Sequence, residues 1–168
     1  MDPGLKTLQE ELASVTAGLS ADRLRWHPPG KWCAAEVLEH LYLSYTGTAK
    51  GFSRVLQAQK AVVTPITWKQ RRNLLIVLGF GYLPTGREAP SSVRPRGLPA
   101  EKVMAEIAAK IGEMDALIAN CESKFGKVRL MDHPVLGPLT GAQWRKFHLV
   151  HGRHHIKQIQ RLKEGPQA

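Results

Sequence analysis

Apolar residues recur at steps of three and four along four separate stretches of the chain, and this spacing constrains the fold more than any other feature. In residues 5–19 the repeat consists of Leu5, Leu8, Leu12, Val15 and Leu19. Similar patterns run through residues 33–59, 99–122 and 140–163. Side chains three and four residues apart share one face of an α-helix, and helices with one apolar face bury it against each other. We therefore expect an all-α fold, a four-helix bundle with long connections, in which residues 1–168 form a single domain.

The connections between these helices carry few regular signals. "RWHPPGKW" is expected to form a loop whose Trp26 and Trp32 side chains pack against the core. Cys33, which follows it, is a poor N-terminal capping residue for the next helix. In residues 64–98, "TWKQRRNLLIVLGF" could form a short helix, whereas the proline-rich remainder is a loop that acts either as a lid or as an ordered strap. Residues 123–139 are expected to be irregular, without strands. Thr140 and Gln143 match a capping box at the start of the last helix.

Positive charge is concentrated in two segments of a chain whose net charge is +10. Residues 64–98 carry six Lys or Arg and one Glu, and residues 140–163 carry six Lys or Arg and no acid. Such a field favours an anionic ligand, a nucleic-acid backbone or an acidic partner, although a solvated basic face is an equally good interpretation. No apolar run is long enough for a membrane span, and no secretion signal is evident. With Cys33 and Cys121 far apart in the sequence, a cytoplasmic protein with free thiols is expected.

Four of the seven histidines lie within eight residues, in "HLVHGRHH" at positions 148–155. On a helical wheel, His148, His151 and His155 fall within roughly 40° of Trp144, on the apolar face. Lys146, Arg153, Lys157 and Arg161 lie on the far side of this helix. Burying several imidazoles together is costly unless their nitrogens find partners, and a metal ion satisfies them all at once.

His151 and His155 are one helical turn apart, a spacing that lets two imidazoles bind one metal ion. Gly152 follows the first of them, where a zinc metalloprotease would have a catalytic glutamate, so a protease is not indicated. A third ligand is expected from "EVLEHL", where His40 lies on the apolar face of its helix. By itself such a histidine is more often a hydrogen-bonded core residue, but beside the His151–His155 pair a three-histidine site is the better interpretation. His148 is a candidate for contact with the ligands or with substrate, and the first candidate for a general base.

The other histidines are weaker candidates. His27 and His133 lie in proline-containing loops, where structural or exposed roles are expected. His154 is expected at the boundary between the buried and exposed faces of its helix.

Two segments resemble the DinB-like superfamily, which includes the YfiT-type proteins. They are "LRWHPPGKWCAAEVLEHL" and "GPLTGAQWRKFHLVHGRHHIKQI", the second with the family's HxxxHH-plus-Gln ending. The resemblance implies a four-helix bundle that holds a divalent metal with His40, His151 and His155. Some relatives are transferases or isomerases that use the thiols bacillithiol or mycothiol. Cys33 departs from the family pattern, which usually has serine at this position.

Two classes of function follow from these features. In the first, zinc, nickel, iron or copper bound by three imidazoles keeps open positions and activates a water or a thiol, as in a metal-dependent thiol transferase. Arg71, Arg72 and Arg87 are candidates to hold an anionic thiol or substrate. In the second, the chain is a non-catalytic binding protein for nucleic acid or another anionic partner, and the metal only stabilises the bundle. Nucleic-acid binding is disfavoured because no helix-turn-helix or zinc-finger spacing is present. No membrane partner is expected. The formation of a homodimer through a helix face is an alternative that the sequence leaves open.

Overall fold

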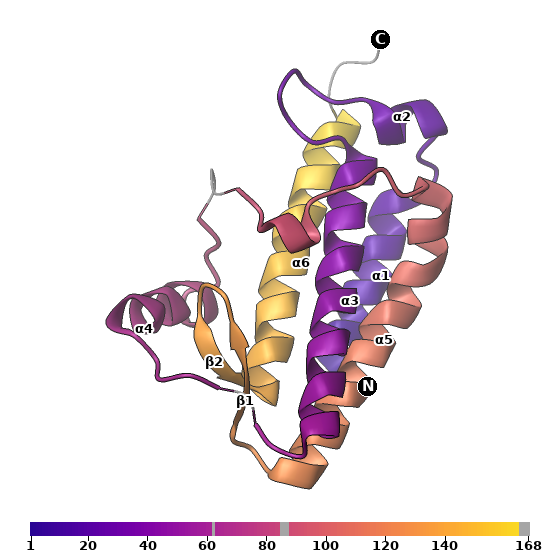
Figure 1. The fold of residues 1–168 in the computed structure, drawn as a ribbon. Coiled ribbons are helices and arrows are strands. Elements are labelled where there is room, and N and C mark those ends of the chain that lie inside the picture. The colour runs from indigo at the N-terminus through magenta and orange to yellow at the C-terminus, as the bar shows by residue number, and fades with distance from the viewer. Residues whose placement is uncertain (62, 85–87, 165–168) are drawn as a thin grey trace.

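Four long helices form the body of the computed structural model, which describes residues 1–61, 63–84 and 88–164 (Figure 1). They are α1 (Pro3–Thr16), α3 (Ala34–Ala58), α5 (Ala100–Phe125) and α6 (Gly141–Glu164). Helix α3 packs along both α5 and α6, and α1 packs along α6. Because α3 and α6 run in opposite directions, the N-terminal part of α3 lies beside the C-terminal part of α6 (Figure 1). The predicted all-α bundle is confirmed.

The helix ends follow from local capping chemistry. The Asp2 carboxylate accepts a hydrogen bond from the Leu5 amide, and Pro3 opens α1. At α6 the capping box is present, since Thr140 Oγ1 accepts from the Gln143 amide and Gln143 Oε1 accepts from the Thr140 amide. At α3 the Cys33 amide donates to Glu36 Oε2 at 2.8 Å, so the glutamate offsets the poor capping residue. These bonds satisfy amides that a helix leaves without intrahelical partners.

The connections contain more structure than the sequence indicated. A short helix α2 (Ala21–Arg25) precedes the proline-rich loop. The expected short helix is present as α4 (Trp68–Leu74), which continues into a π-helical turn over Leu75–Gly79. Residues 88–98, called the strap from here on, contain one 3-10 turn (Ser91–Val93) and run past α6 and α3 to the start of α5 (Figure 1). The ordered-strap alternative fits this segment, and Arg87 lies outside the described residues.

Residues 123–139 were expected to be irregular, and this prediction is wrong for part of the segment. Strands β1 (Arg129–His133) and β2 (Gly137–Thr140) form an antiparallel hairpin beside α6. The strands have only five and four residues, with a bulge in β1, which is too short to display an alternating pattern. Pro138 also sits inside β2, where proline argues against a strand. The hairpin packs its central leucines, Leu130 and Leu139, into the core with no exposed surface.

The bundle interior is mostly apolar, and buried histidines interrupt it where α3 faces α6. Tyr45, Phe52, Ile111, Met114 and Ile118 are completely buried in this core. Four histidines on α3 and α6 are also buried: His40, His148, His151 and His155. Within the described ranges, no helix combines the length and the apolar character that crossing a membrane requires.

Candidate metal centre

Three buried imidazoles meet where the first half of α3 faces the middle of α6. His40 Nε2 lies 3.0 Å from His151 Nε2, and His155 Nε2 lies 3.2 Å from the same atom. One nitrogen from each ring lies within 4.8 Å of the other two. The side chains are 5%, 7% and 8% exposed for His40, His151 and His155, respectively. The three residues that the sequence singled out as ligands therefore come together.

Two of the three separations between these nitrogens match those of ligands bound to one ion. Zinc–imidazole bonds are about 2.0–2.1 Å long, so two tetrahedral ligands stand about 3.3 Å apart and two ligands at a right angle about 2.9 Å apart. The distances from His151 Nε2 to His40 Nε2 and to His155 Nε2, 3.0 and 3.2 Å, lie within or close to these limits. Aromatic neighbours hold the rings in place: the ring of Trp32 lies 5.2 Å from that of His40, and Phe147 stacks on His151 at 5.2 Å with an interplanar angle of 13°.

Hydrogen bonds on the far side of two rings fix their tautomers. His40 Nδ1 lies 2.9 Å from the Val93 carbonyl oxygen, and His155 Nδ1 lies 3.0 Å from Gln158 Oε1. Both oxygens can only accept, so each Nδ1 carries a proton and each Nε2 presents a lone pair. This arrangement, in which one nitrogen is tied by a hydrogen bond and the other is free, is typical of metal-ligating histidines.

Without a cation, the ring nitrogens of the three histidines cannot all find hydrogen-bond partners. His151 Nε2 faces two lone pairs, and a proton on this atom could be donated to only one of them. If the proton sits instead on His151 Nδ1, three lone pairs converge, and that buried Nδ1 makes no hydrogen bond within the described residues. Either tautomer leaves a buried polar atom unsatisfied, which is costly. A divalent ion would bind the three converging lone pairs, so these residues fit the metal; the Nδ1 proton of His151 would still have no partner among the described residues.

Burial also keeps these imidazoles neutral, as metal ligands must be. Burial away from water lowers the pKa of His40, and the Val93 carbonyl partly opposes this shift. The pKa of His155 is lowered to about 3, mainly by burial and then by the nearby His40. Burial and the surrounding histidines hold the pKa of His151 well below its ordinary value. Near neutral pH the three rings therefore present nitrogen lone pairs rather than positive charges.

Comparisons with known proteins agree with the fold. A family model described as the DinB superfamily matches residues 5–159. The chain belongs to the DinB superfamily. It is also 28% identical over 153 residues to the uncharacterized protein YuaE of Bacillus subtilis (strain 168), covering 88% of this chain and 87% of that protein. No solved structure matches the chain.

His148, the candidate general base of this DinB-superfamily chain, lies one turn before His151 and is completely buried. Its Nε2 is 3.0 Å from Thr48 Oγ1, while Nδ1 is buried without a hydrogen bond among the described residues. Burial, with a smaller contribution from His133, lowers its pKa to about 3. The ring stacks on that of Trp144, with 5.8 Å between the ring centroids. Its role in proton transfer stays a prediction.

The remaining candidates lie outside the cluster of three nitrogens, and of these the His154 ring lies 5.1 Å from the ring of His155. His133 Nδ1 accepts hydrogen bonds from the Val135 and Leu136 amides and so closes the hairpin turn, a structural role. His27 is exposed, and His154 is half-buried, as a boundary position should be. The cations expected near the site, Arg71 and Arg72, lie on the exposed surface of α4.

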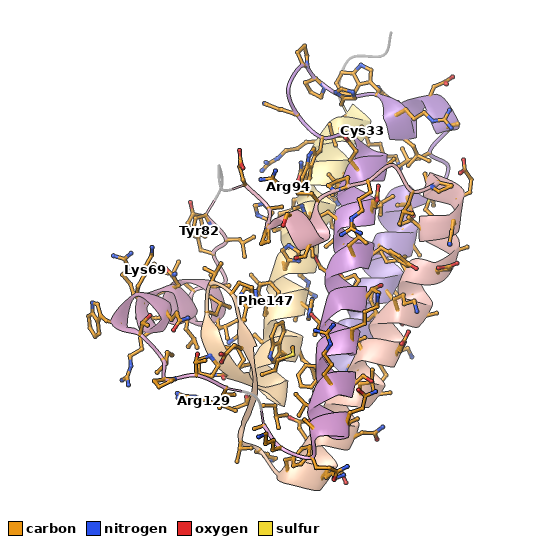
Figure 2. The ribbon with its side chains drawn as sticks, in the orientation of Figure 1. Cys33, Lys69, Tyr82, Arg94, Arg129 and Phe147 are labelled. Atoms are coloured by element: carbon orange, nitrogen blue, oxygen red, sulfur yellow. The ribbon has the colours of Figure 1, made fainter. Side chains whose placement is uncertain are left out.

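Sequence reasoning missed several residues that shape this DinB site. Arg94 belongs to the strap, directly follows Val93 and lies beside α6 (Figure 2). Glu39 is 2% exposed although its neighbours along the chain gave no reason to expect a buried carboxylate. Gly152 lets α6 approach α1, because a Cβ there would lie 2.7 Å from Leu8 Cδ1. Only Gly152 had a visible signal, a glycine inside a long helix.

Proposed function

We propose that this protein is a metal-dependent enzyme that binds one divalent ion, zinc, nickel or iron, through His40, His151 and His155. The observation that carries the proposal is the convergence of three ring nitrogens, two of which are lone-pair donors because their Nδ1 atoms are tied to oxygen acceptors. Three neutral histidine ligands leave coordination positions open, as catalytic rather than structural sites do.

The reaction class that we propose is the transfer or isomerisation of a substrate that uses a thiol. When bound, a divalent ion supplies Lewis acidity and lowers the pKa of a thiol or water that occupies an open position. In a thiol transfer, a bond forms between sulfur and an electrophilic carbon, the S–H proton is lost, and the leaving group departs with its electron pair. The thiol cofactors bacillithiol and mycothiol of some superfamily members support this class by analogy alone.

The chain's own residues would bind and orient the reactants. Arg94 and Arg96 on the strap have exposed side chains and follow the carbonyl that contacts His40, so they are better placed than Arg71 or Arg72 to hold an anionic thiol or substrate. His148 is the proposed proton acceptor. Its low pKa makes it a weak base, so we expect a modest contribution to the rate.

The proposal is tested by the metal content of matched histidine variants. The wild type, His151→Ala and His154→Ala are stripped with a chelator, reloaded with zinc and dialysed, and the bound zinc is measured by elemental analysis. We expect about one ion per chain for the wild type and for His154→Ala, whose half-buried ring lies outside the cluster. His151→Ala should retain almost none. Equal zinc content in all three proteins would remove His151 as a ligand.

The competing function is a non-catalytic binding protein whose metal stabilises the bundle. Two observations favour it: each ligand is less than one-tenth exposed, and α4 presents Trp68, Lys69, Arg71 and Arg72 to solvent, a surface suited to an anionic partner. A cobalt-loaded sample separates the two functions. A sulfur-to-metal absorption band that grows with added thiol supports the enzyme. A metal-dependent rise in melting temperature without such a band, together with salt-sensitive DNA binding by the metal-free protein, supports the alternative.

A further inference from the structure

Glu39 is a buried carboxylate directly beside the candidate ligand His40. Its Oε1 accepts a hydrogen bond from the Arg96 amide at 2.7 Å, and its Oε2 accepts from the Gly97 and Leu98 amides at 3.0 and 3.1 Å. Three successive strap amides thus converge on one side chain of α3. This arrangement compensates a charge that would otherwise be costly to bury.

Apart from the packing of its 3-10 turn against α3 and of Leu98 against the core, the strap has few other polar connections to the bundle. Its remaining polar contacts lie mostly within itself, as between Arg94 Nε and the Ala89 carbonyl and between the Arg96 guanidinium and the Ser92 carbonyl. Among the described residues, the hydrogen bonds between the strap and α3 all come from Glu39 and His40. Glu39 makes three of these bonds and His40 makes one. Glu39 is therefore the main polar anchor of the strap.

The two attachments belong to one structural unit. The strap amides bound by Glu39 lie three to five residues after Val93, whose carbonyl accepts the Nδ1 proton of His40. Nothing in a helical histidine by itself selects the Nδ1–H tautomer, and a free imidazole in water mostly carries its proton on the other nitrogen. The position of a backbone carbonyl decides which nitrogen of His40 is free.

We propose that Glu39 is a positioning residue for the metal centre: it anchors residues 96–98 of the strap, and the strap in turn places the Val93 carbonyl that holds His40 in its metal-binding tautomer. The proposal rests in part on the proposed metal site, but its first step concerns the metal-free protein. The strap therefore serves as a backbone support for a ligand, and its attachment controls how well the site is formed before any ion binds.

Glu39→Gln tests this step with little change in shape. A glutamine offers one oxygen, and its NH₂ group would face strap amides that are themselves donors. Either the Arg96 amide or the Gly97 and Leu98 amides would lose their acceptor, so the strap should loosen. Glu106→Gln is the matched control, because the Glu106 carboxylate of α5 accepts a hydrogen bond from Tyr42 Oη of α3 but none from the described residues of the strap.

Two measurements are made on wild type and both variants. Long-range ¹H–¹⁵N NMR spectra of the metal-free proteins report the tautomer of each histidine, and the His40 signals are assigned by their loss in His40→Gln. Competition with a chromophoric chelator gives the zinc Kd. We expect Nδ1–H for His40 in the wild type and in Glu106→Gln, and a mixed or reversed tautomer in Glu39→Gln. The zinc Kd of Glu39→Gln should be about 10–100-fold weaker, the usual cost of losing a partner of a ligand.

The outcomes separate this proposal from the proposed function. Wild-type His40 in the Nε2–H form would overturn it without any variant, as would a folded Glu39→Gln with the wild-type tautomer and a zinc Kd within twofold. If Glu39→Gln does not fold, Glu39→Asp replaces it, and the shorter carboxylate should give an intermediate shift in both readouts. A wild type that binds no zinc refutes the proposed function, whereas the tautomer measurement still decides the role of Glu39.

Discussion

His148 should make the metal-free protein sensitive to mild acid, and one substitution isolates this effect. The imidazole is completely buried, and its pKa is about 3 in the folded state against 6.5 in an unfolded chain. Between these two values the unfolded chain binds a proton that the folded protein excludes. The contribution of His148 to stability is therefore present above pH 6.5 and is lost progressively as the pH falls toward 3.

The size of the effect follows from the two pKa values. At pH 7.5 the unfolded imidazole is about one-tenth protonated, and at pH 5.5 it is about nine-tenths protonated, while the folded ring stays neutral throughout. Proton binding over this interval favours the unfolded state by about 1.4 kcal/mol. For a chain of this length, that loss corresponds to a fall of about 4 °C in melting temperature.

The assay compares the wild type with His148→Gln, in which the amide can still reach Thr48 but cannot titrate. Urea unfolding is followed by circular dichroism at pH 7.5 and 5.5, with a chelator present so that no metal ion stabilises the folded state. Other titrating groups cancel between the two proteins. We expect the wild type to lose about 1.4 kcal/mol more than the variant on acidification. Equal losses in both proteins would refute the assignment of His148 as a buried, neutral imidazole.

Two further substitution pairs test the packing of the bundle by its free energy of unfolding. Gly152→Ala places a Cβ against Leu8 and should lower the free energy of unfolding by about 1–3 kcal/mol. Gly112→Ala meets open space inside α5 and should raise the free energy of unfolding by about 0.5–1 kcal/mol. Similar effects from both substitutions would contradict the close approach of α1 and α6. Arg145→Met should lower the free energy of unfolding by about 3 kcal/mol, because it leaves the buried Asp115 carboxylate of α5 without its ion pair. Arg153→Met, which breaks an exposed pair, should cost less than about 1 kcal/mol, and a reversed order would show that burial does not control these ion pairs.

Local features of the fold were predictable from the sequence because they depend on neighbours along the chain. The step of three and four residues predicted all four long helices, and the Thr140–Gln143 capping box marks the start of α6. The same periodicity placed His151 and His155 on one inward face. The hairpin in residues 129–140 was not predictable, because strands of four and five residues depend on each other and on the core for their stability.

The sequence by itself determined which side chains could bind a metal, since ring type and helical spacing set the face on which each histidine lies. The tertiary structure alone decided that His40 meets the α6 pair, because this requires α3 and α6 to pack antiparallel with matching levels. It also decided the supports of the site. The acceptor for His40 is a backbone carbonyl 53 residues away, and the donors for Glu39 are backbone amides 57–59 residues away. Backbone groups are the same at every residue, so only the folded path of the chain could select them.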